Sequence, residues 1–432
     1  ELNIGMVHQH FKLVSNYTIA ENIVLGVEPQ KKALGLFPYV DMKKANREIA
    51  ELSKQYGLEV DPTKVVSDLN VSTRQRVEIL KMLYRQAEIL IFDEPTAVLT
   101  PQEIDSLLKI IQNLRDGGKT IILITHKLDE IKKVADRCAV LRRGKLITVR
   151  DVADVDTREM ASLMVGHEVE LKLEKTPARF GKEILSVKNL TVQNEDKFDV
   201  VKNVSFSIHE GEIFAIAGVS GNGQTEIADA IAGLLPVSSG SISVAGEEIT
   251  HQSVRKRTRS GLFSYIPEDR QNVGLILDFR LDEDLGLRRY YREPFSHRHV
   301  LSRKQFRQYG DQLIDKYDIR SAEGNETIVR SMSGGNQQKA IVGREIEENS
   351  PLILFVQPTR GLDIGAIDRI HRQILEEREK GKAILLVSLE LDEVMQLADT
   401  IGVIYGGQLN KIASASEFTT AEVGEYMMGV KK

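Results

Sequence analysis

The sequence is poor in cysteine, in long apolar runs and in excess positive charge. Cys138 is the only cysteine, which excludes a disulfide-built scaffold and is typical of a reducing compartment. The longest apolar runs, such as residues 121–124 and 384–387, are far shorter than the roughly 20 residues of a membrane-spanning helix. We therefore expect any association with a membrane to be peripheral.

The charge balance gives no case for nucleic acid as the main partner. The chain has 58 Lys and Arg against 63 Asp and Glu, a net charge of −5, so it lacks the positive field that attracts phosphate backbones. The one strongly basic stretch, residues 255–259, is predicted to be a solvated helix face. At 432 residues the chain has room for about two or three domains.

The second half of the chain repeats the first. Residues 87–96 align with residues 350–359, an offset of 263 (357 − 94). The same offset relates three functional positions in register: Glu94 to Gln357, Asn70 to Ser333, and His126 to Leu389. Nearer the front, Gln9 maps to Glu268 with an offset of 259. A period this long indicates two copies of one domain rather than a solenoid.

The repeat predicts a first domain over 1–170, a short charged linker over 171–182 and a second domain over 183–432. Projecting Gly218 back by 259 residues gives position −41. We therefore expect the first copy to be truncated at its front and to lack the loop equivalent to Gly218, whereas the second copy is expected to be complete.

Short apolar runs alternate with amphipathic stretches in both copies. Strands are predicted over 89–92, 120–125, 212–217, 352–356 and 383–388, and helices over 103–114, 225–235 and 366–380. This alternation predicts an α/β fold with a mainly parallel sheet in each copy.

A glycine-rich turn follows the predicted strand 212–217. It matches the phosphate loop G-x-x-x-x-G-K-[ST] except that Gln224 replaces the lysine. Its candidate ligands are Gly218, Gly221, Asn222, Gly223, Gln224 and Thr225. Losing a charge-assisted hydrogen bond of roughly 1.5–3 kcal/mol should weaken phosphate binding without abolishing it. Taken alone, such a turn is as compatible with a structural role as with phosphate binding.

The strand 89–92 ends in two acids. Ligands of parallel sheets collect at this edge, so Asp93 is a candidate Mg²⁺ ligand and Glu94 a candidate base for an attacking water. The alternative is that both acids cap the next helix. In the second copy Val356 and Gln357 replace them. Because general-base catalysis contributes about 10²–10⁴-fold, a nucleotide bound there should turn over very slowly.

A second anion-binding candidate is a run of small residues before a helix: Ser333, Gly334, Gly335, Asn336 and Gln337. The counterpart, residues 70–74, has lost both glycines. A lone histidine such as His126 is more often structural, but its place in the repeat, one strand beyond the acids, favours catalysis. Gln9 is a candidate sensor of the γ-phosphate or of Mg²⁺.

In this order, these motifs resemble the ATP-binding-cassette (ABC) ATPases across essentially the whole chain. Two fused cassettes with residues 267–270 (Pro-Glu-Asp-Arg), 337–339 (Gln-Gln-Lys) and 357–363 look like the ATPase subunit of bacterial simple-sugar importers. Residues 5–11 and 221–226 are most similar to the nucleoside-importing branch. The resemblance implies two P-loop NTPase domains, each with a parallel sheet core and a helical subdomain.

The resemblance further implies that cassettes pair head to tail around ATP and Mg²⁺. The competent site would combine Gln9, Asp93, Glu94 and His126 with Ser333, Gly334, Gly335, Gln337 and Asp363, with Asp93 and Gln9 at the metal. The impaired site would combine Gln224, Val356, Gln357 and Leu389 with residues 70–75. The losses thus fall on one site rather than on both.

The implied partners are two integral-membrane permease subunits and, indirectly, an extracytoplasmic substrate-binding lipoprotein, with no nucleic acid. The segments after Gln9 and near Glu268 would contact the permeases, and the protein would lie peripherally on the cytoplasmic face of the membrane. Because permease and binding protein select the substrate, the residues do not distinguish nucleosides from sugars.

Two other functions stay open from the residues. The chain could be a catalytically silent nucleotide-binding scaffold, and we expect the polypeptide that starts at Glu1 not to hydrolyse ATP by itself. A ribosome-acting tandem cassette fits less well, because its two sites would be intact and its linker long. An upstream G-x-x-x-x-G-K-[ST] in the gene would favour the enzyme.

Overall fold

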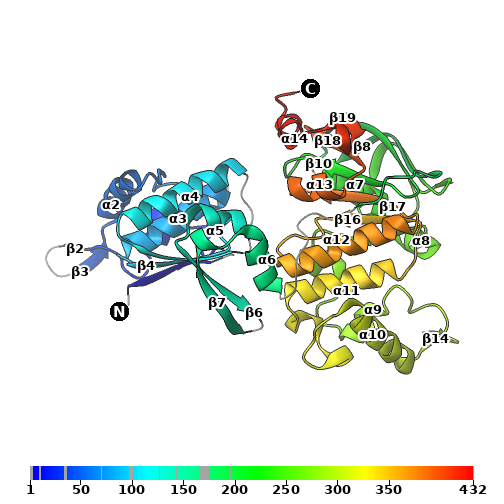
Figure 1. The fold of residues 1–432 in the computed structure, drawn as a ribbon. Helices are drawn as coiled ribbons and strands as arrows, with labels where there is room; N and C mark the ends of the chain where they lie inside the picture. Colours follow the sequence, from blue (N-terminus) through cyan, green and yellow to red (C-terminus); the bar gives the residue numbers. More distant parts are fainter. Residues whose placement is uncertain are drawn as a thin grey trace. The chain divides into compact units, whose positions relative to one another are not determined.

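The computed structural model describes residues 3–8, 11–33, 37–69, 71–96, 101–125, 127–142, 144–165, 175–194 and 196–431. The chain forms two compact units, Glu1–Val169 and Glu170–Lys432, and each is described by itself (Figure 1). None of the helices described is long and apolar enough to cross a bilayer.

The first unit is built on a three-stranded parallel sheet in the order β1-β4-β5, in which Ile4 pairs with Ile89 and Ile89 with Thr120. Its strands are β1 (Ile4–Val7), β2 (Gln30–Ala33), β3 (Phe37–Val40), β4 (Ile89–Asp93), β5 (Thr120–Ile124), β6 (Arg137–Arg142) and β7 (Lys145–Asp151). Its helices are α1 (Ile19–Val24), α2 (Met42–Gln55), α3 (Val71–Tyr84), α4 (Pro101–Asp116), α5 (Leu128–Val134) and α6 (Thr157–Val165).

Local chemistry explains where the first helices begin. The Thr18 side chain accepts from the Glu21 backbone N–H while the Glu21 carboxylate accepts from Thr18, a capping box that starts α1. Asp41 caps α2 by accepting from Lys44 N–H. These helices cover one core with the sheet, in which Ile23 and Phe92 are fully buried.

The second unit combines a six-stranded sheet, β13-β16-β17-β10-β18-β19, with a four-stranded antiparallel sheet, β12-β11-β8-β9. Its strands are β8 (Glu183–Gln193), β9 (Asp199–His209), β10 (Ile213–Ala217), β11 (Val237–Val244), β12 (Glu247–Glu248), β13 (Phe263–Ile266), β14 (Ser296–His297), β15 (Val300–Leu301), β16 (Leu352–Val356), β17 (Ala383–Ser388), β18 (Thr400–Tyr405) and β19 (Gln408–Ser414).

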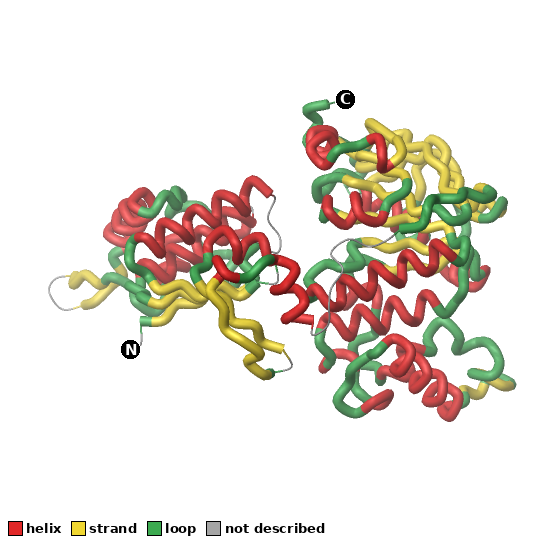
Figure 2. The backbone as a smooth tube through the Cα atoms, in the orientation of Figure 1, coloured by secondary structure: helices red, strands yellow, loops and turns green. Residues whose placement is uncertain are grey.

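Its helices are α7 (Gln224–Ala232), α8 (Val254–Ser260), α9 (Leu281–Leu285), α10 (Arg303–Tyr317), α11 (Gly334–Ile346), α12 (Ile364–Glu379), α13 (Leu391–Leu397) and α14 (Thr420–Met427), with a π-helical turn at Arg270–Gly274. Apart from the β14–β15 hairpin, its strands gather at one end and α9 and α10 lie at the other, with α11 and α12 between them (Figure 2). Every residue of β10, β16 and β17 is buried, because both faces of the parallel part of this sheet are covered.

Two apolar cores flank that sheet. One lies between the two sheets and includes α7, and the other lies under α9 to α12. The predicted strands and helices correspond to β4, β5, β10, β16, β17, α4, α7 and α12, with ends shifted by up to three residues. The predicted α/β architecture with parallel sheets is therefore confirmed.

The repeat is visible in the sheets. Strands β1, β4 and β5 follow the same parallel order as β13, β16 and β17. In the second unit β10 pairs on one side with β17 and on the other with β18. Among the residues described in the first unit, no strand pairs with the outer edge of β5, and the β6–β7 hairpin pairs only with itself. Consistently, Ile122 and Ile124 of β5 are each 47% exposed, whereas β17 is wholly buried.

The prediction that residues 255–259 form a solvated helix face is wrong for Arg257. This side chain is 2% exposed, and its Nη1 donates to the carbonyls of Ala230 and Ile231 at the end of α7, each at 2.7 Å. Its Nη2 donates to Thr250 O at 2.7 Å. The carbonyls in the last turn of α7 carry the partial negative charge of the helix C-terminus, which attracts the cation. Arg255 on the same helix is exposed, as predicted.

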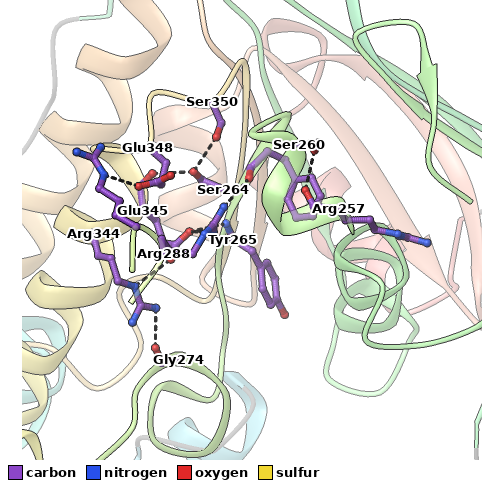
Figure 3. A network of polar contacts seen from close by, with 12 residues as sticks. Arg257, Ser260, Ser264, Tyr265, Gly274, Arg288, Arg344, Glu345, Glu348 and Ser350 are labelled. Carbon is purple, nitrogen blue, oxygen red and sulfur yellow. Dashed lines mark hydrogen bonds and ion pairs between the residues drawn. The ribbon is translucent and has the colours of Figure 1, made fainter. Parts of the chain in front are cut away.

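The C-terminal end of α11 is held by a buried ionic network (Figure 3). Arg344 donates to Glu345 at 3.0 Å, to Asp284 at 2.6 Å and to the carbonyl of Gly274 at 2.7 Å. Arg288 also pairs with Glu345. The helix is thereby fastened to the segments that follow β13, namely the turn at Gly274 and the region of α9. This positions the other end of α11, where the small-residue turn lies.

An Arg–Asp ion pair occurs in both units at the repeat offset. Arg115 and Asp136 correspond to Arg378 and Asp399, since 115 + 263 = 378 and 136 + 263 = 399. Arg378 binds Asp399 through two bonds of 2.7 and 3.0 Å, with side chains only 3% and 4% exposed. Arg115 lies 3.5 Å from Asp136, with side chains 38% and 80% exposed. Asp399 also accepts from Ile213 N–H of β10 at 3.0 Å, and this partner makes the buried pair part of the sheet.

We predict that Asp399→Asn lowers the free energy of unfolding by about 3 kcal/mol, because it leaves the Arg378 charge buried without its partner. The matched change Asp136→Asn should cost less than about 0.5 kcal/mol, because both groups are solvated. Urea titration followed by circular dichroism measures both. Equal losses in the two variants would contradict the prediction.

Candidate nucleotide site

The loop Gly218–Thr225 connects β10 to α7 and has the backbone form of an anion cradle. Gly223 adopts φ = 104°, a left-handed conformation, immediately before the first helical residue. A Cβ on Gly218 would lie 2.6 Å from Ile404 Cγ2, so only glycine fits there. Asn222 fastens the loop by donating to Val219 O at 3.1 Å and accepting from Gly406 N–H at 2.8 Å. The first backbone N–H groups of α7 follow this loop directly, and a helix N-terminus favours an anion.

Gln224 stands where a phosphate loop has lysine, and it is 2% exposed. Its Nε2 donates to the carbonyls of Val219 at 2.9 Å and Gly218 at 3.3 Å, both in the loop. Its Oε1 is buried and has no hydrogen-bond partner among the described residues. The amide therefore keeps the loop closed as a neutral brace, but brings no cation to the phosphates.

We predict that Gln224→Lys tightens ATP binding to the second unit at least about tenfold, since a cation–phosphate hydrogen bond adds roughly 1.5–3 kcal/mol. Gln224→Met, which has similar length but no donor, should not bind more tightly than the natural residue. Titration with a fluorescent ATP analogue measures both affinities. An unchanged affinity for Gln224→Lys would show that the loop does not take phosphate.

The ends of β4 and β16 have the same backbone turn. Glu94 has φ = 43° and Gln357 has φ = 51°, the left-handed region that residues other than glycine seldom adopt. The Glu94 N–H donates to Ile124 O and the Gln357 N–H to Val387 O, both at 2.8 Å. The two positions are therefore structurally equivalent, although only Glu94 carries a carboxylate that could act as a base.

A buried hydroxyl–carboxylate pair follows each of these turns and was missed by sequence reasoning. Thr96 donates to Glu130 at 2.5 Å, and Thr359 donates to Glu393 at 2.9 Å. The two pairs are related by the 263-residue offset, so applying that offset to every polar residue would have revealed them. Each pair ties the segment after the acidic or amide turn to the helix that follows the next strand.

Asp93 ends β4, directly before Glu94, and its counterpart Val356 is fully buried. The predicted pair of acids thus lies together at the carboxyl end of a parallel strand. The other predicted residues of this group, Gln9 and His126, lie outside the described residues, as does Asn70.

A polar chain starts from the phosphate loop of the second unit. Thr225 Oγ1 donates to Glu268 Oε2 at 3.2 Å, and the other Glu268 oxygen pairs with Arg360. Arg270 then donates to the Arg360 carbonyl at 3.3 Å. Burial and the neighbouring Arg360 charge lower the pKa of the Arg270 guanidinium. From the sequence, Arg270 and Arg360 were quoted only as parts of motifs and were given no role, because their contacts span about 90 residues.

The turn Ser333–Gly335 begins α11, with Ser333 exposed at the N-cap position. A Cβ on Gly334 would lie 3.1 Å from Arg270 Nη2, so this glycine makes room for the guanidinium. Gln337 is buried and donates to Val329 O at 3.0 Å, which places it beneath the turn. Asp363 begins α12, where its Oδ1 accepts from Ala366 N–H at 2.9 Å.

Asp318, at the end of α10, joins the helices around this turn. Arg369 of α12 donates to its carboxylate at 2.6 Å and Lys339 of α11 at 3.1 Å. Burial acts to raise the pKa of Asp318, but the hydrogen bonds from Lys339 and Arg369 outweigh it and lower the pKa to about 2. The ionised carboxylate is therefore favoured in the folded protein.

We predict that Asp318→Asn lowers the stability of the second unit at pH 7. The folded-state pKa lies below the unfolded value of about 3.9, so the contribution is fully present above pH about 4 and is lost as the pH falls towards 2. The stability difference between the natural protein and Asp318→Asn should shrink over that window in urea titrations. Asp315→Asn, an exposed change on the same helix, is the control. A pH-independent difference would contradict the ionic origin.

The residues fit a magnesium ion that is shared with phosphate. Among the described residues, no group of three His, Cys, Asp or Glu side chains could hold a metal by itself. Mg²⁺ in nucleotide sites uses one or two carboxylates together with phosphate oxygens and water. Asp93 in the first unit, and Thr225 beside Glu268 in the second, are donors of that kind.

The family model described as "ABC transporter" matches residues 1–97 and 201–360. The chain is 48% identical over 429 residues to the guanosine import ATP-binding protein NupO of Bacillus subtilis, covering 99% of this chain and 83% of that protein. It is 46% identical over 428 residues to the nucleoside import ATP-binding protein NupA of Lactococcus lactis, with the same two coverages, 99% and 83%.

A more distant relative is the putative ribose/galactose/methyl galactoside import ATP-binding protein 2 of Rhizobium meliloti, with 34% identity over 98% of this chain and 80% of that protein. Among solved structures, a nucleotide-free ATP-binding cassette from an ABC transporter covers 57% of this chain and 98% of its own, with 19% identity and a TM-score of 0.48.

The fold and the repeated nucleotide-site motifs thus define a protein with two ATP-binding cassettes of the ATPase class. The chain belongs to the ABC transporter family. The resemblance stated from the motifs is confirmed.

Proposed function

We propose that this protein is the ATP-hydrolysing subunit of a bacterial importer for nucleosides or simple sugars, with nucleosides favoured. Support comes from the relatives at 46–48% identity, which are named for guanosine and nucleoside import, whereas the relative at 34% is named for sugars. ATP is the nucleotide, and Mg²⁺ is its expected counter-ion.

We further propose that the two ATP sites are unequal. The observation that carries this proposal is the identical turn at Glu94 and Gln357, which has a carboxylate in one copy and an amide in the other. Three more losses fall on the same side: Gln224 for lysine, Val356 for Asp93 and Leu389 for His126. The second copy in return keeps Ser333, Gly334 and Gly335. Random drift would have distributed the losses over both sets.

In this proposal Asp93 and Gln9 hold Mg²⁺, Glu94 activates water, His126 contacts the γ-phosphate, and Ser333, Gly334, Gly335, Gln337 and Asp363 complete the competent site. Gly218, Gly221, Asn222, Gly223, Gln224 and Thr225 bind the nucleotide that turns over slowly. The protein lies peripherally on the cytoplasmic face of the membrane. Two permease subunits and a substrate-binding lipoprotein complete the importer, in which nucleotide binding and hydrolysis shift the populations of the permease states.

We predict that Glu94→Gln lowers kcat for ATP by about 10²–10⁴-fold, because it removes the general base. The matched change Gln357→Glu should alter kcat by less than about twofold, since Val356 supplies no carboxylate for the metal. The measurements are phosphate release and uptake of a labelled nucleoside, with the protein expressed from its complete gene together with its membrane partners.

A full rate for Glu94→Gln together with a loss for Gln357→Glu would reverse the assignment of the two sites. Unchanged uptake in both variants, with ATP still bound, would favour the silent scaffold. Uptake of a labelled pentose instead of a nucleoside would correct the substrate class without affecting the assignment of the ATP sites.

A further inference from the structure

Ser333 has an exposed hydroxyl that does not serve its own helix. Although it occupies the N-cap position of α11, its side chain makes no capping bond within the part of the chain that the structure describes. Its Oγ instead lies 2.9 Å from Asn336 Nδ2, which donates to it. The hydroxyl oxygen is therefore occupied by an amide donor one turn further along the helix.

The orientation of the Asn336 amide is settled by a backbone group. Asn336 Oδ1 lies 2.9 Å from the backbone N–H of Arg320. A backbone N–H can only donate, so the amide oxygen must face Arg320 and the NH₂ group must face Ser333. The usual ambiguity between the oxygen and nitrogen of an asparagine side chain does not arise here.

This orientation determines the direction of the serine hydroxyl. Because Ser333 Oγ accepts from Asn336, its own hydrogen must point elsewhere, and the exposed side of the turn faces solvent. We propose that Asn336 is a positioning residue that turns the Ser333 hydroxyl outward, so that it donates a hydrogen bond to the γ-phosphate of ATP. This inference rests on the proposed role of Ser333 in the competent site.

The device is anchored to the helices around it. The backbone N–H of Arg320 orients the amide, and this residue lies two positions after Asp318. The Nη2 of the Arg320 side chain also donates to the Asp318 carboxylate at 3.4 Å. Asp318 in turn binds Lys339 of α11 and Arg369 of α12. The amide therefore follows the position of α10 relative to α11, and a movement of α10 would release the hydroxyl.

The first copy has no residues for the same device. At the repeat offset, Asn70 stands for Ser333 and Thr73 for Asn336. There is thus no serine hydroxyl at the first position and no amide at the second. The serine–asparagine pair occurs only in the copy whose turn also keeps both glycines. This is expected if the pair serves phosphate binding by that turn.

Asn336→Asp tests the inference with an almost isosteric change. One carboxylate oxygen still accepts from Arg320 N–H, but the other now faces Ser333 and accepts the hydroxyl hydrogen. The serine then presents an oxygen lone pair to the phosphate in place of a hydrogen-bond donor. In the protein expressed from its complete gene, we expect kcat/KM for ATP to fall by about 10- to 100-fold. The affinity for ADP should change by less than about twofold, because ADP has no γ-phosphate. A purely structural role would change both nucleotides alike.

A charge control and a double-mutant cycle separate the hydroxyl from the added charge. Asn349→Asp makes the same change beyond the other end of α11, where Oδ1 accepts from Lys382 Nζ at 2.6 Å, and it should leave kcat/KM unchanged. In a Ser333→Ala background, Asn336→Asp should cost less than about threefold. A full penalty in that background would show direct repulsion and overturn the inference.

Asn336→Ala provides a second, uncharged variant. It frees the hydroxyl to rotate, so we expect a loss of about three- to tenfold that is sub-additive with Ser333→Ala. If Ser333→Ala itself has no effect on ATP turnover, the proposed role of the turn fails. If Ser333→Ala impairs turnover while Asn336→Asp and Asn336→Ala do not, only the positioning role fails. Thermal denaturation of each variant confirms that it is folded.

Discussion

The left-handed turn that ends β4 and β16 is the constraint on which the rest of each unit depends. Holding a residue other than glycine in this conformation costs of order 1–3 kcal/mol, and in both copies the N–H of the turn residue is bonded to the carbonyl of the neighbouring strand. That bond uses only backbone atoms. The turn therefore keeps its shape with glutamate or with glutamine. The buried Thr96–Glu130 and Thr359–Glu393 pairs stabilise it by joining the segment after the turn to α5 or α13.

The shape of this turn does not depend on which side chain it carries. If the two ATP sites are unequal as proposed, this independence explains how the second copy keeps its fold with different side chains at these positions. Gln224 gives up the cation of a phosphate loop but braces two loop carbonyls. Val356 gives up a carboxylate at a position that is fully buried in the sheet. In each case the replacement satisfies the local packing or hydrogen-bonding requirement, so the second unit remains a well-ordered platform for the Ser333 turn.

The Ser333 turn is controlled from both of its sides. Arg270, which belongs to the polar chain from Thr225, packs against Gly334, and Asn336 connects Ser333 to the Asp318 cluster. At the far end of the helix, the Arg344–Glu345 network binds α11 to the segments that follow β13. A turn held at so many points can present a hydroxyl in one direction, which is what recognition of a phosphate oxygen requires.

The sequence by itself determined the repeat, the strand and helix order and the positions of the acidic turn and the glycine-rich loop. These features depend on short-range patterns and on a constant offset, which a chain carries without being folded. Sequence reasoning failed where long-range burial decided the outcome. Arg257 was expected in solvent but is buried against α7, and the same Arg–Asp pair is buried at Asp399 and exposed at Asp136.

Only the tertiary structure decided which way the Ser333 hydroxyl points. The sequence leaves both orientations of the Asn336 amide possible. The backbone N–H of Arg320, which selects one of them, lies 16 residues away and outside α11. Hydrogen-bond polarity depends on which groups folding brings within about 3 Å of each other. That proximity is a property of packed helices and sheets, and no local pattern of residues specifies it.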